Sequence, residues 1–212
     1  YLDYLAHLDC IAAKAKYAHK QNAILPSISQ EKKIKLIDAF HPILWMKNNA
    51  QGIDTVPQSI TLNQQQQIIV ISGPNAGGKS ITLKTIGLLQ VMLQSGLLIP
   101  VDEKSETYIF DTILTDIGDN QSIENQLSTY SYRLKNMRYF LRKCNKNTLF
   151  LIDEFGTGSD PELGGALAEI FLEEFYHKKA FGIITTHYAN LKVLANELEN
   201  VTNANMQFNE RT

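Results

Sequence analysis

Residues 68–80 hold the feature that most constrains the fold, a short apolar segment that runs into a glycine-rich turn. Four consecutive β-branched residues, Ile68 to Ile71, precede Ser72 and a turn with glycine at 73, 77 and 78. Such a run favours a buried strand, and glycine permits backbone angles that other residues avoid. From Lys79 the apolar residues recur at helical spacing. The segment therefore predicts a strand, a turn and a helix from about Lys79 to Ser95.

The turn has the P-loop pattern, and its residue types suit a polyphosphate. Bare glycine backbone lets several N–H groups approach the phosphate oxygens, and the start of a helix favours an anion. A lysine at 79 places a cation between the outer phosphates, and a hydroxyl at 80 binds Mg²⁺. The sequence thus predicts a triphosphate site formed by Gly73, Pro74, Asn75, Ala76, Gly77, Gly78, Lys79, Ser80 and Ile81, with Ser80 as a metal ligand.

A second apolar strand, Leu149–Ile152, ends in two adjacent carboxylates, Asp153 and Glu154. A carboxylate at the end of a buried strand lies beside a phosphate loop, where Asp153 can hold Mg²⁺. Glu154 can orient or deprotonate an attacking water. The pair favours hydrolysis over transfer to another acceptor, because a kinase needs an acceptor site and usually no water-activating glutamate.

A third apolar strand, Phe181–Thr185, leads to Thr186 and His187. The carboxyl ends of parallel strands share one edge of a sheet, so His187 is predicted to lie near Lys79 and to bind the terminal phosphate. A single histidine is more often structural, and we expect that role for the others. His7 and His19 fall on the exposed face of a first helix, and His177 falls at a helix end.

Strands that alternate with helices predict an α/β fold with a mostly parallel sheet. The expected helices span residues 1–20, 79–95, 124–144 and 160–177, with a short one ending at 195. The expected strands span 34–40, 56–62, 68–72, 107–114, 149–152 and 181–185, with a turn at 64–67. Asp160 and Pro161 resemble the N-cap and first position of a helix.

Composition excludes several classes of protein. The 20 basic and 22 acidic residues give a net charge of −2, so no overall positive field attracts nucleic acid. The longest apolar runs fall far short of the roughly 18–20 residues that cross a bilayer. Cys10 and Cys144 show no metal or disulfide spacing, which indicates a reducing, cytoplasmic location. Because the chain starts without Met, we expect a piece of a longer protein.

Seven motifs in order resemble the ATPase domain of the MutS family, a branch of the ABC-type ATPases, over about residues 30–208. They are Phe40–Leu44, Gly73–Ser80, Asp116–Asp119, Ser128–Tyr130, Leu151–Glu154, Gly156–Pro161 and Thr185–His187. The resemblance implies an ATPase that binds ATP and Mg²⁺. It also implies that residues 1–26 end a long helical lever and that 27–212 form the P-loop ATPase domain.

Within this family the chain is most similar to the second bacterial branch, which lacks the mismatch-reading domain and often carries a small nuclease domain. Ala76 stands where mismatch-repair members typically have Met, and the stretches 83–89 and 121–124 also match that branch. Phe40 departs from the family, which commonly has Arg before the His-Pro pair.

In ABC-type enzymes a second subunit covers the terminal phosphate with a serine-containing turn at a helix start. The resemblance places Ser128 and Thr129 in that role, with Asp160 at the dimer interface, although Ser128 as a simple N-cap fits the sequence equally well. It implies ATP-driven closure of a homodimer that controls a DNA clamp in recombination control or DNA repair, with DNA held by other domains.

Two alternatives are a mismatch-repair MutS and a ribosome-associated ATPase that rescues stalled ribosomes. For adenine, an apolar residue of the loop Ile53–Val56 is a candidate.

Overall fold

The structure is a computed structural model that describes residues 1–73, 78–118, 129–155 and 161–206. The chain forms two compact units, each described here by itself. The mixed-sheet unit consists of residues 1–61 and 84–109, and the parallel-sheet unit consists of 62–83 and 110–212. Two elements, β3 (Gln58–Leu62) and α3 (Lys79–Gln94), contribute residues to both units.

The parallel-sheet unit is built on five strands, β4 (Ile68–Ser72), β6 (Thr112–Asp116), β7 (Thr148–Ile152), β8 (Phe181–Thr185) and β9 (Val201–Asn205). Their order is β6-β7-β8-β4-β9, and all four neighbouring pairs are parallel. The strand before the phosphate loop, β4, is therefore separated from β7 by β8. This sheet confirms the predicted α/β fold with parallel strands.

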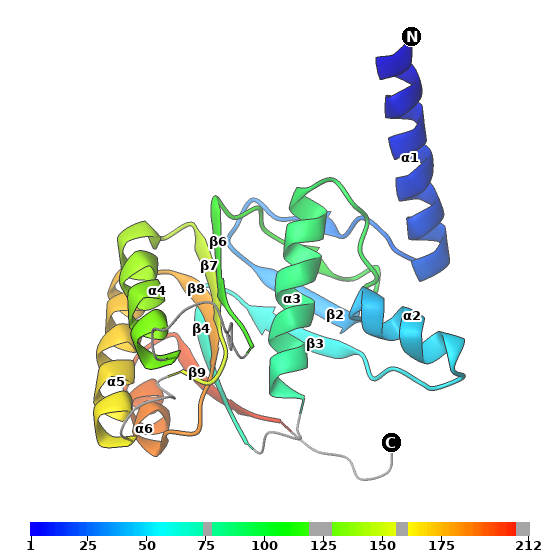
Figure 1. Ribbon diagram of the computed structural model, residues 1–212. Coiled ribbons are helices and arrows are strands. Elements are labelled where there is room, and N and C mark those ends of the chain that lie inside the picture. The colour runs from blue at the N-terminus through cyan, green and yellow to red at the C-terminus, as the bar shows by residue number, and fades with distance from the viewer. Residues whose placement is uncertain (74–77, 119–128, 156–160, 207–212) are drawn as a thin grey trace. The chain divides into compact units, whose positions relative to one another are not determined.

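Three helices of this unit, α4 (Thr129–Lys143), α5 (Pro161–His177) and α6 (Ala189–Glu197), lie on one face of the sheet (Figure 1). Every residue of the inner strands β4, β7 and β8 is buried, whereas the edge strands β6 and β9 are partly exposed. In the core the ring of Phe150 from β7 stacks on Phe175 from α5, with centroids 4.4 Å apart. Apolar residues on both faces explain why these strands are continuous runs in the sequence.

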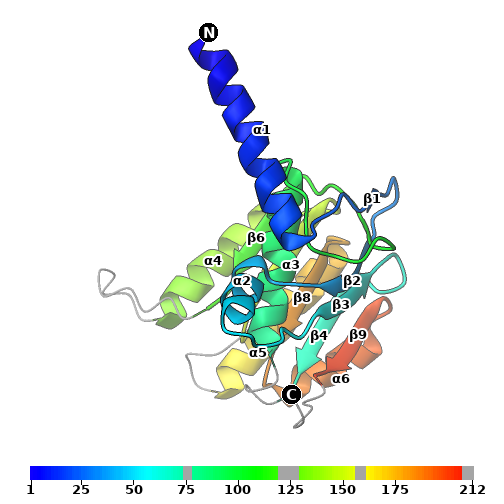
Figure 2. The same cartoon turned by 90° about the vertical axis from the view of Figure 1, so that its right-hand side faces the viewer.

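The mixed-sheet unit contains a four-stranded sheet in the order β1-β5-β2-β3. The bounds of its other strands are β1 (Ser27–Ile28), β2 (Ile34–Ala39) and β5 (Glu106–Thr107). Strand β5 runs parallel to β1 and antiparallel to β2. The unit also holds α1 (Leu2–Gln21), α2 (Pro42–Ala50) and the C-terminal part of α3. Figure 2 shows α1 as one continuous helix, and its residues 2–13 are exposed.

The prediction of a single strand at 107–114 is wrong, because this segment contributes one strand to each of the two sheets. Strand β5 ends at Thr107 and β6 begins at Thr112. The carbonyl of Tyr108 between them accepts a hydrogen bond from Gln90 Nε2 at 2.7 Å, so this backbone pairs with a side chain rather than with a strand. The helix α2 and the strands β1 and β9 were not predicted either. Proline at the first position of α2, capped by His41 Nδ1 that accepts from the Leu44 N–H, was a signal for that helix.

Candidate nucleotide site

The ends of the predicted phosphate loop have the backbone that a bare turn requires. Strand β4 ends at Ser72, Gly73 has φ of +131°, Gly78 has φ of +78°, and α3 begins at Lys79. A Cβ on Gly78 would lie 3.3 Å from Cγ2 of Ile81 as well as requiring a strained φ. The predicted strand and helix are therefore present, and the two described glycines at the ends of the turn have positive φ. The predicted residues Pro74, Asn75, Ala76 and Gly77 lie outside the described ranges.

Lys79 is buried at the start of α3, with only 2% of its surface exposed. Its Nζ donates a hydrogen bond to the carbonyl of Gly73, so the ammonium reaches back to the residue that follows β4. Burial lowers the pKa of Lys79, while the nearby carboxylates of Glu154 and Asp153 act to raise it. The predicted lysine and carboxylates are therefore close enough to interact electrostatically.

Asp153, the first residue after β7, is buried and held in place by Thr185 at the end of β8. Thr185 Oγ1 donates to Asp153 Oδ1 at 2.6 Å and accepts from the N–H of Glu154 at 2.7 Å. One hydroxyl thus orients the carboxylate and the backbone of the next residue. The sequence placed Thr185 at this edge, but its pairing with Asp153 depends on β7 and β8 being neighbours.

Glu154 adopts a left-handed backbone with φ of +50°. This conformation costs a non-glycine residue about 1–2 kcal/mol, so the surrounding contacts must hold it. Arg133 of α4 provides one of them, since its Nη1 donates to the carbonyl of Glu154 at 2.6 Å. Arg133 was not predicted, because α4 also carries Arg138 and Arg142, and no feature of the sequence sets one of these arginines apart.

His187 lies two residues after β8, and its Nε2 is 3.9 Å from Glu154 Oε1. Its side chain is 43% exposed. The structure therefore brings together Lys79, Asp153, Glu154 and His187 at the carboxyl edge of the parallel sheet. The positions predicted for three other histidines are confirmed, since His7 and His19 are exposed on α1 and His177 is the last residue of α5.

Of the remaining predicted ligands, the structure describes the side chains of only some. Ser80 and Ile81 are half-buried in the first turn of α3. Thr129 is the first residue of α4, its side chain lies outside the description, and Ser128 and Asp160 lie outside the described ranges. The oxygen ligands offered by Ser80 and Asp153, beside a buried lysine and a turn free of side chains at Gly73 and Gly78, fit Mg²⁺ and a triphosphate. Ile53 and Val56, from the predicted adenine loop, are 53% and 59% exposed.

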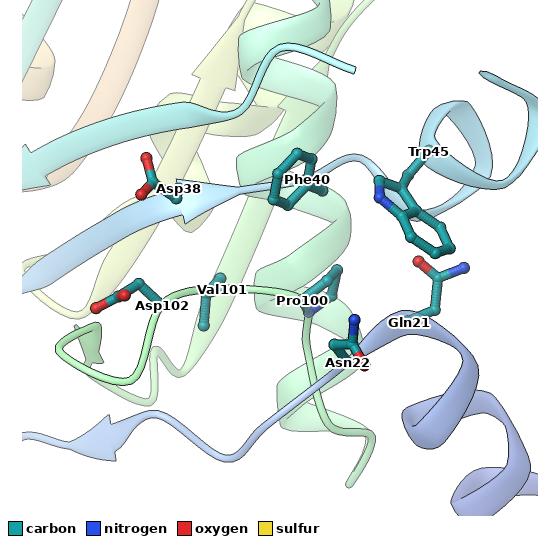
Figure 3. Close-up of a pocket in the computed structure, with 8 residues that line it drawn as sticks. All are labelled: Gln21, Asn22, Asp38, Phe40, Trp45, Pro100, Val101 and Asp102. Carbon is teal, nitrogen blue, oxygen red and sulfur yellow. The ribbon is translucent and has the colours of Figure 1, made fainter. Parts of the chain in front are cut away.

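A pocket of about 260 Å³ lies in the mixed-sheet unit and contains none of these residues. The residues that line it include Phe40, Trp45, Asp38, Asp102 and Gln21 (Figure 3). Gln21 is 3% exposed, and its Oε1 has no hydrogen-bond partner among the described residues. The pocket is a feature separate from the predicted nucleotide site.

Across the part of the chain that the structure describes, no helix is both long enough and apolar enough to cross a membrane.

A family model and several known proteins match this chain in sequence. The family model of MutS domain V matches residues 69–212. A protein named endonuclease MutS2 from Finegoldia magna is 46% identical over 210 residues, which are 99% of this chain and 26% of that protein. Proteins of the same name from Ligilactobacillus salivarius and Geobacillus sp. are 46% and 44% identical over 98% and 100% of the chain. In each case the chain spans about a quarter of the relative's length, 26%.

The matched region contains all of β4 except Ile68, the phosphate loop, Asp153, Glu154 and His187, so the family assignment and the observed site concern the same residues. The chain therefore belongs to the MutS family, within its MutS2 branch, and carries the ATPase domain of that family.

Proposed function

We propose that this chain binds Mg²⁺ and ATP and hydrolyses the terminal phosphate. The observation that carries the proposal is the meeting of Lys79, Asp153 and Glu154 at one edge of the parallel sheet, where burial and the two carboxylates act on the same ammonium group. A buried cation next to two carboxylates at the end of a glycine turn suits a bound polyanion with a metal ion. Bound Mg²⁺ would neutralise charge on the phosphate oxygens, and Ser80 and Asp153 would hold it.

The residues divide the work of hydrolysis. Lys79 binds the outer phosphates, and His187 donates a hydrogen bond to the terminal one. Glu154 accepts a proton from the attacking water as the water oxygen bonds to the γ-phosphorus and the bond to the β,γ-bridging oxygen breaks. The products are ADP and inorganic phosphate. Catalysis here depends on position and charge, which is why Thr185 and the strained backbone of Glu154 matter.

In the full protein we propose an ABC-type arrangement, in which two copies close on ATP. The N-terminal end of α4, with Ser128 and Thr129, would cover the phosphate of the other copy. Residues 1–26 would end a helical lever and 27–212 would form the ATPase domain. This closure would control a DNA clamp in recombination control or DNA repair, with DNA bound by other domains. The names of the relatives, together with the net charge of −2, support a DNA-handling protein whose DNA contacts lie elsewhere.

The substitution Glu154→Gln tests the catalytic assignment. It keeps the size of the side chain and removes the proton acceptor, so turnover should fall by about 100-fold or more while ATP affinity stays nearly unchanged. Steady-state phosphate release and equilibrium binding of labelled ATP measure the two quantities. Glu162→Gln, at an exposed position in the first turn of α5, is the matched control. Normal turnover in the Glu154 variant would remove Glu154 as the base.

The composite site is tested separately with Ser128→Arg. A bulky cation at this position should leave ATP binding by single subunits intact and prevent ATP-dependent dimerisation, which light scattering in the presence of Mg²⁺ and ATP detects. Lys135→Ala, at an exposed position of α4, provides the control. If the Ser128 variant dimerises and hydrolyses ATP normally, the active site is complete within one chain.

A further inference from the structure

Arg133 connects α4 to the turn that carries the catalytic carboxylates. Its Nη1 donates to the carbonyl of Glu154 at 2.6 Å and approaches the carbonyl of Asp153 at 3.5 Å. Hydrogen bonds from a charged donor are about twice as strong as neutral ones. The guanidinium therefore holds the backbone of two consecutive site residues from the side of the helix.

The same turn is held through its N–H groups by the neighbouring strands. The N–H of Asp153 donates to the carbonyl of Asp116 at 2.8 Å, and the N–H of Glu154 donates to Thr185 Oγ1. The N–H of Phe155 donates to the carbonyl of Thr185 at 2.9 Å. Arg133 acts on the carbonyl side of the turn, so it completes the support of a residue in the left-handed region. Without it, the carbonyl side of Glu154 would lose this support for its left-handed φ.

Arg133 also has a second neighbour that offers a purely structural explanation. Asp116 is 6% exposed, burial raises the pKa of its carboxyl, and Arg133 opposes this effect by its charge. Asn136, one turn further along α4, donates to Asp116 Oδ1 at 3.4 Å. The two roles of Arg133, as a counter-charge for Asp116 and as a support for Glu154, make different predictions once Asp116 is neutralised.

We propose that Arg133 is a positioning residue that sets the orientation of Glu154 and couples it to α4. The proposal rests on the ATPase function proposed above.

The experiment uses the full chain with Arg133→Met in an Asp116→Asn background. Asn keeps the shape of Asp116 without its charge, so removal of Arg133 leaves no unpaired buried carboxylate. Arg138→Met, exposed on the same helix, is the control. Relative to Asp116→Asn alone, we expect kcat to fall by about 10- to 100-fold, with ATP affinity and melting temperature unchanged. Arg133→Lys should recover part of the loss, because it restores a donor and a charge.

A second measurement does not require turnover. Amide hydrogen exchange, followed in peptides that contain Glu154 and Phe155, should become at least several-fold faster in the double variant and remain unchanged in Arg138→Met. If kcat and exchange in the double variant equal those of Asp116→Asn, Arg133 serves only as a counter-charge and the proposal is wrong. If the unmodified chain hydrolyses no ATP while exchange still responds to Arg133, the proposed function fails and the support of the turn by Arg133 stands.

Discussion

The two units of this chain form the hydrogen bonds of their backbones in different ways. In the parallel-sheet unit the inner strands are paired on both sides and buried at every residue, and the site residues follow directly where these strands end. In the mixed-sheet unit two of the four strands have only two residues each, and side chains complete the hydrogen bonding. Buried Gln90 binds Tyr108 and Thr107, and Ser105 Oγ accepts from the N–H of Ile37.

The difference in structure goes with a difference in predicted role, because the residues predicted for phosphate and metal binding belong to the parallel-sheet unit. The parallel sheet places charged groups from distant parts of the sequence at one edge, where Lys79, Asp153, Glu154 and His187 lie. The mixed-sheet unit contains α1, which buries only Ala18 and Gln21 and exposes several large apolar residues. We therefore expect substitutions of the site residues in the parallel-sheet unit to change nucleotide chemistry, and substitutions in the mixed-sheet unit to change mainly stability.

The largest effect is expected for Lys79→Ala in the parallel-sheet unit. Loss of the buried ammonium removes a charge-assisted contact to phosphate, so the affinity for Mg²⁺ and ATP should fall by about 100-fold or more, which is about 3 kcal/mol. Lys84→Ala, exposed further along the same helix and within the mixed-sheet unit, should leave affinity unchanged. Titration calorimetry measures both. Equal affinities for the two variants would break the assignment of nucleotide binding to the parallel sheet.

Alanine substitutions at two glycines, one in each unit, compare how tightly the two units are packed. A Cβ on Gly182 in β8 would lie 2.5 Å from Cγ of Phe150, whose ring is stacked on Phe175, so Gly182→Ala should destabilise the protein by about 3 kcal/mol. Gly52 has φ of +67° and open space around it. Gly52→Ala should therefore cost only about 1 kcal/mol, from backbone strain. Urea unfolding gives both free energies, and similar values would show that the sheet is less tightly packed than its distances indicate.

The smallest effect concerns the cap of α2 in the mixed-sheet unit. Burial lowers the pKa of His41, the backbone hydrogen bond opposes this, and the charge of Lys84 adds to the lowering. The neutral ring accepts a hydrogen bond from the Leu44 N–H. The contribution of this cap to the free energy of unfolding is therefore fully present above pH 6.5 and is lost as the pH falls through the lowered pKa of His41. His41→Asn, a cap that does not titrate, should reduce the loss of stability between pH 7.5 and 5.5. His41→Ala should cost about 1 kcal/mol at pH 7.5. Unchanged pH dependence in the Asn variant would exclude this cap as its source.

Sequence patterns predicted the parallel-sheet unit well because its signals are local. Apolar runs such as Ile68–Ser72 and Phe181–Thr185 match β4 and β8 residue for residue, and the helix expected from Lys79 to Ser95 ends one residue earlier. The strands β1 and β5 could not be predicted, because two residues carry no periodicity and their pairing joins Ser27 to Glu106, far apart in the sequence. The same reason explains the wrong single strand at 107–114.

The sequence alone determined which groups are available: a glycine turn with Lys79 and Ser80, two carboxylates after one strand and a histidine after another. Only the tertiary structure decided how these groups are supported. The order of the strands places Thr185 against Asp153, and the packing of α4 brings Arg133 to the carbonyl of Glu154. Residue type and local spacing are properties of the chain, whereas a hydrogen bond between Arg133 and Glu154, 21 residues apart, exists only when a helix and a strand end meet.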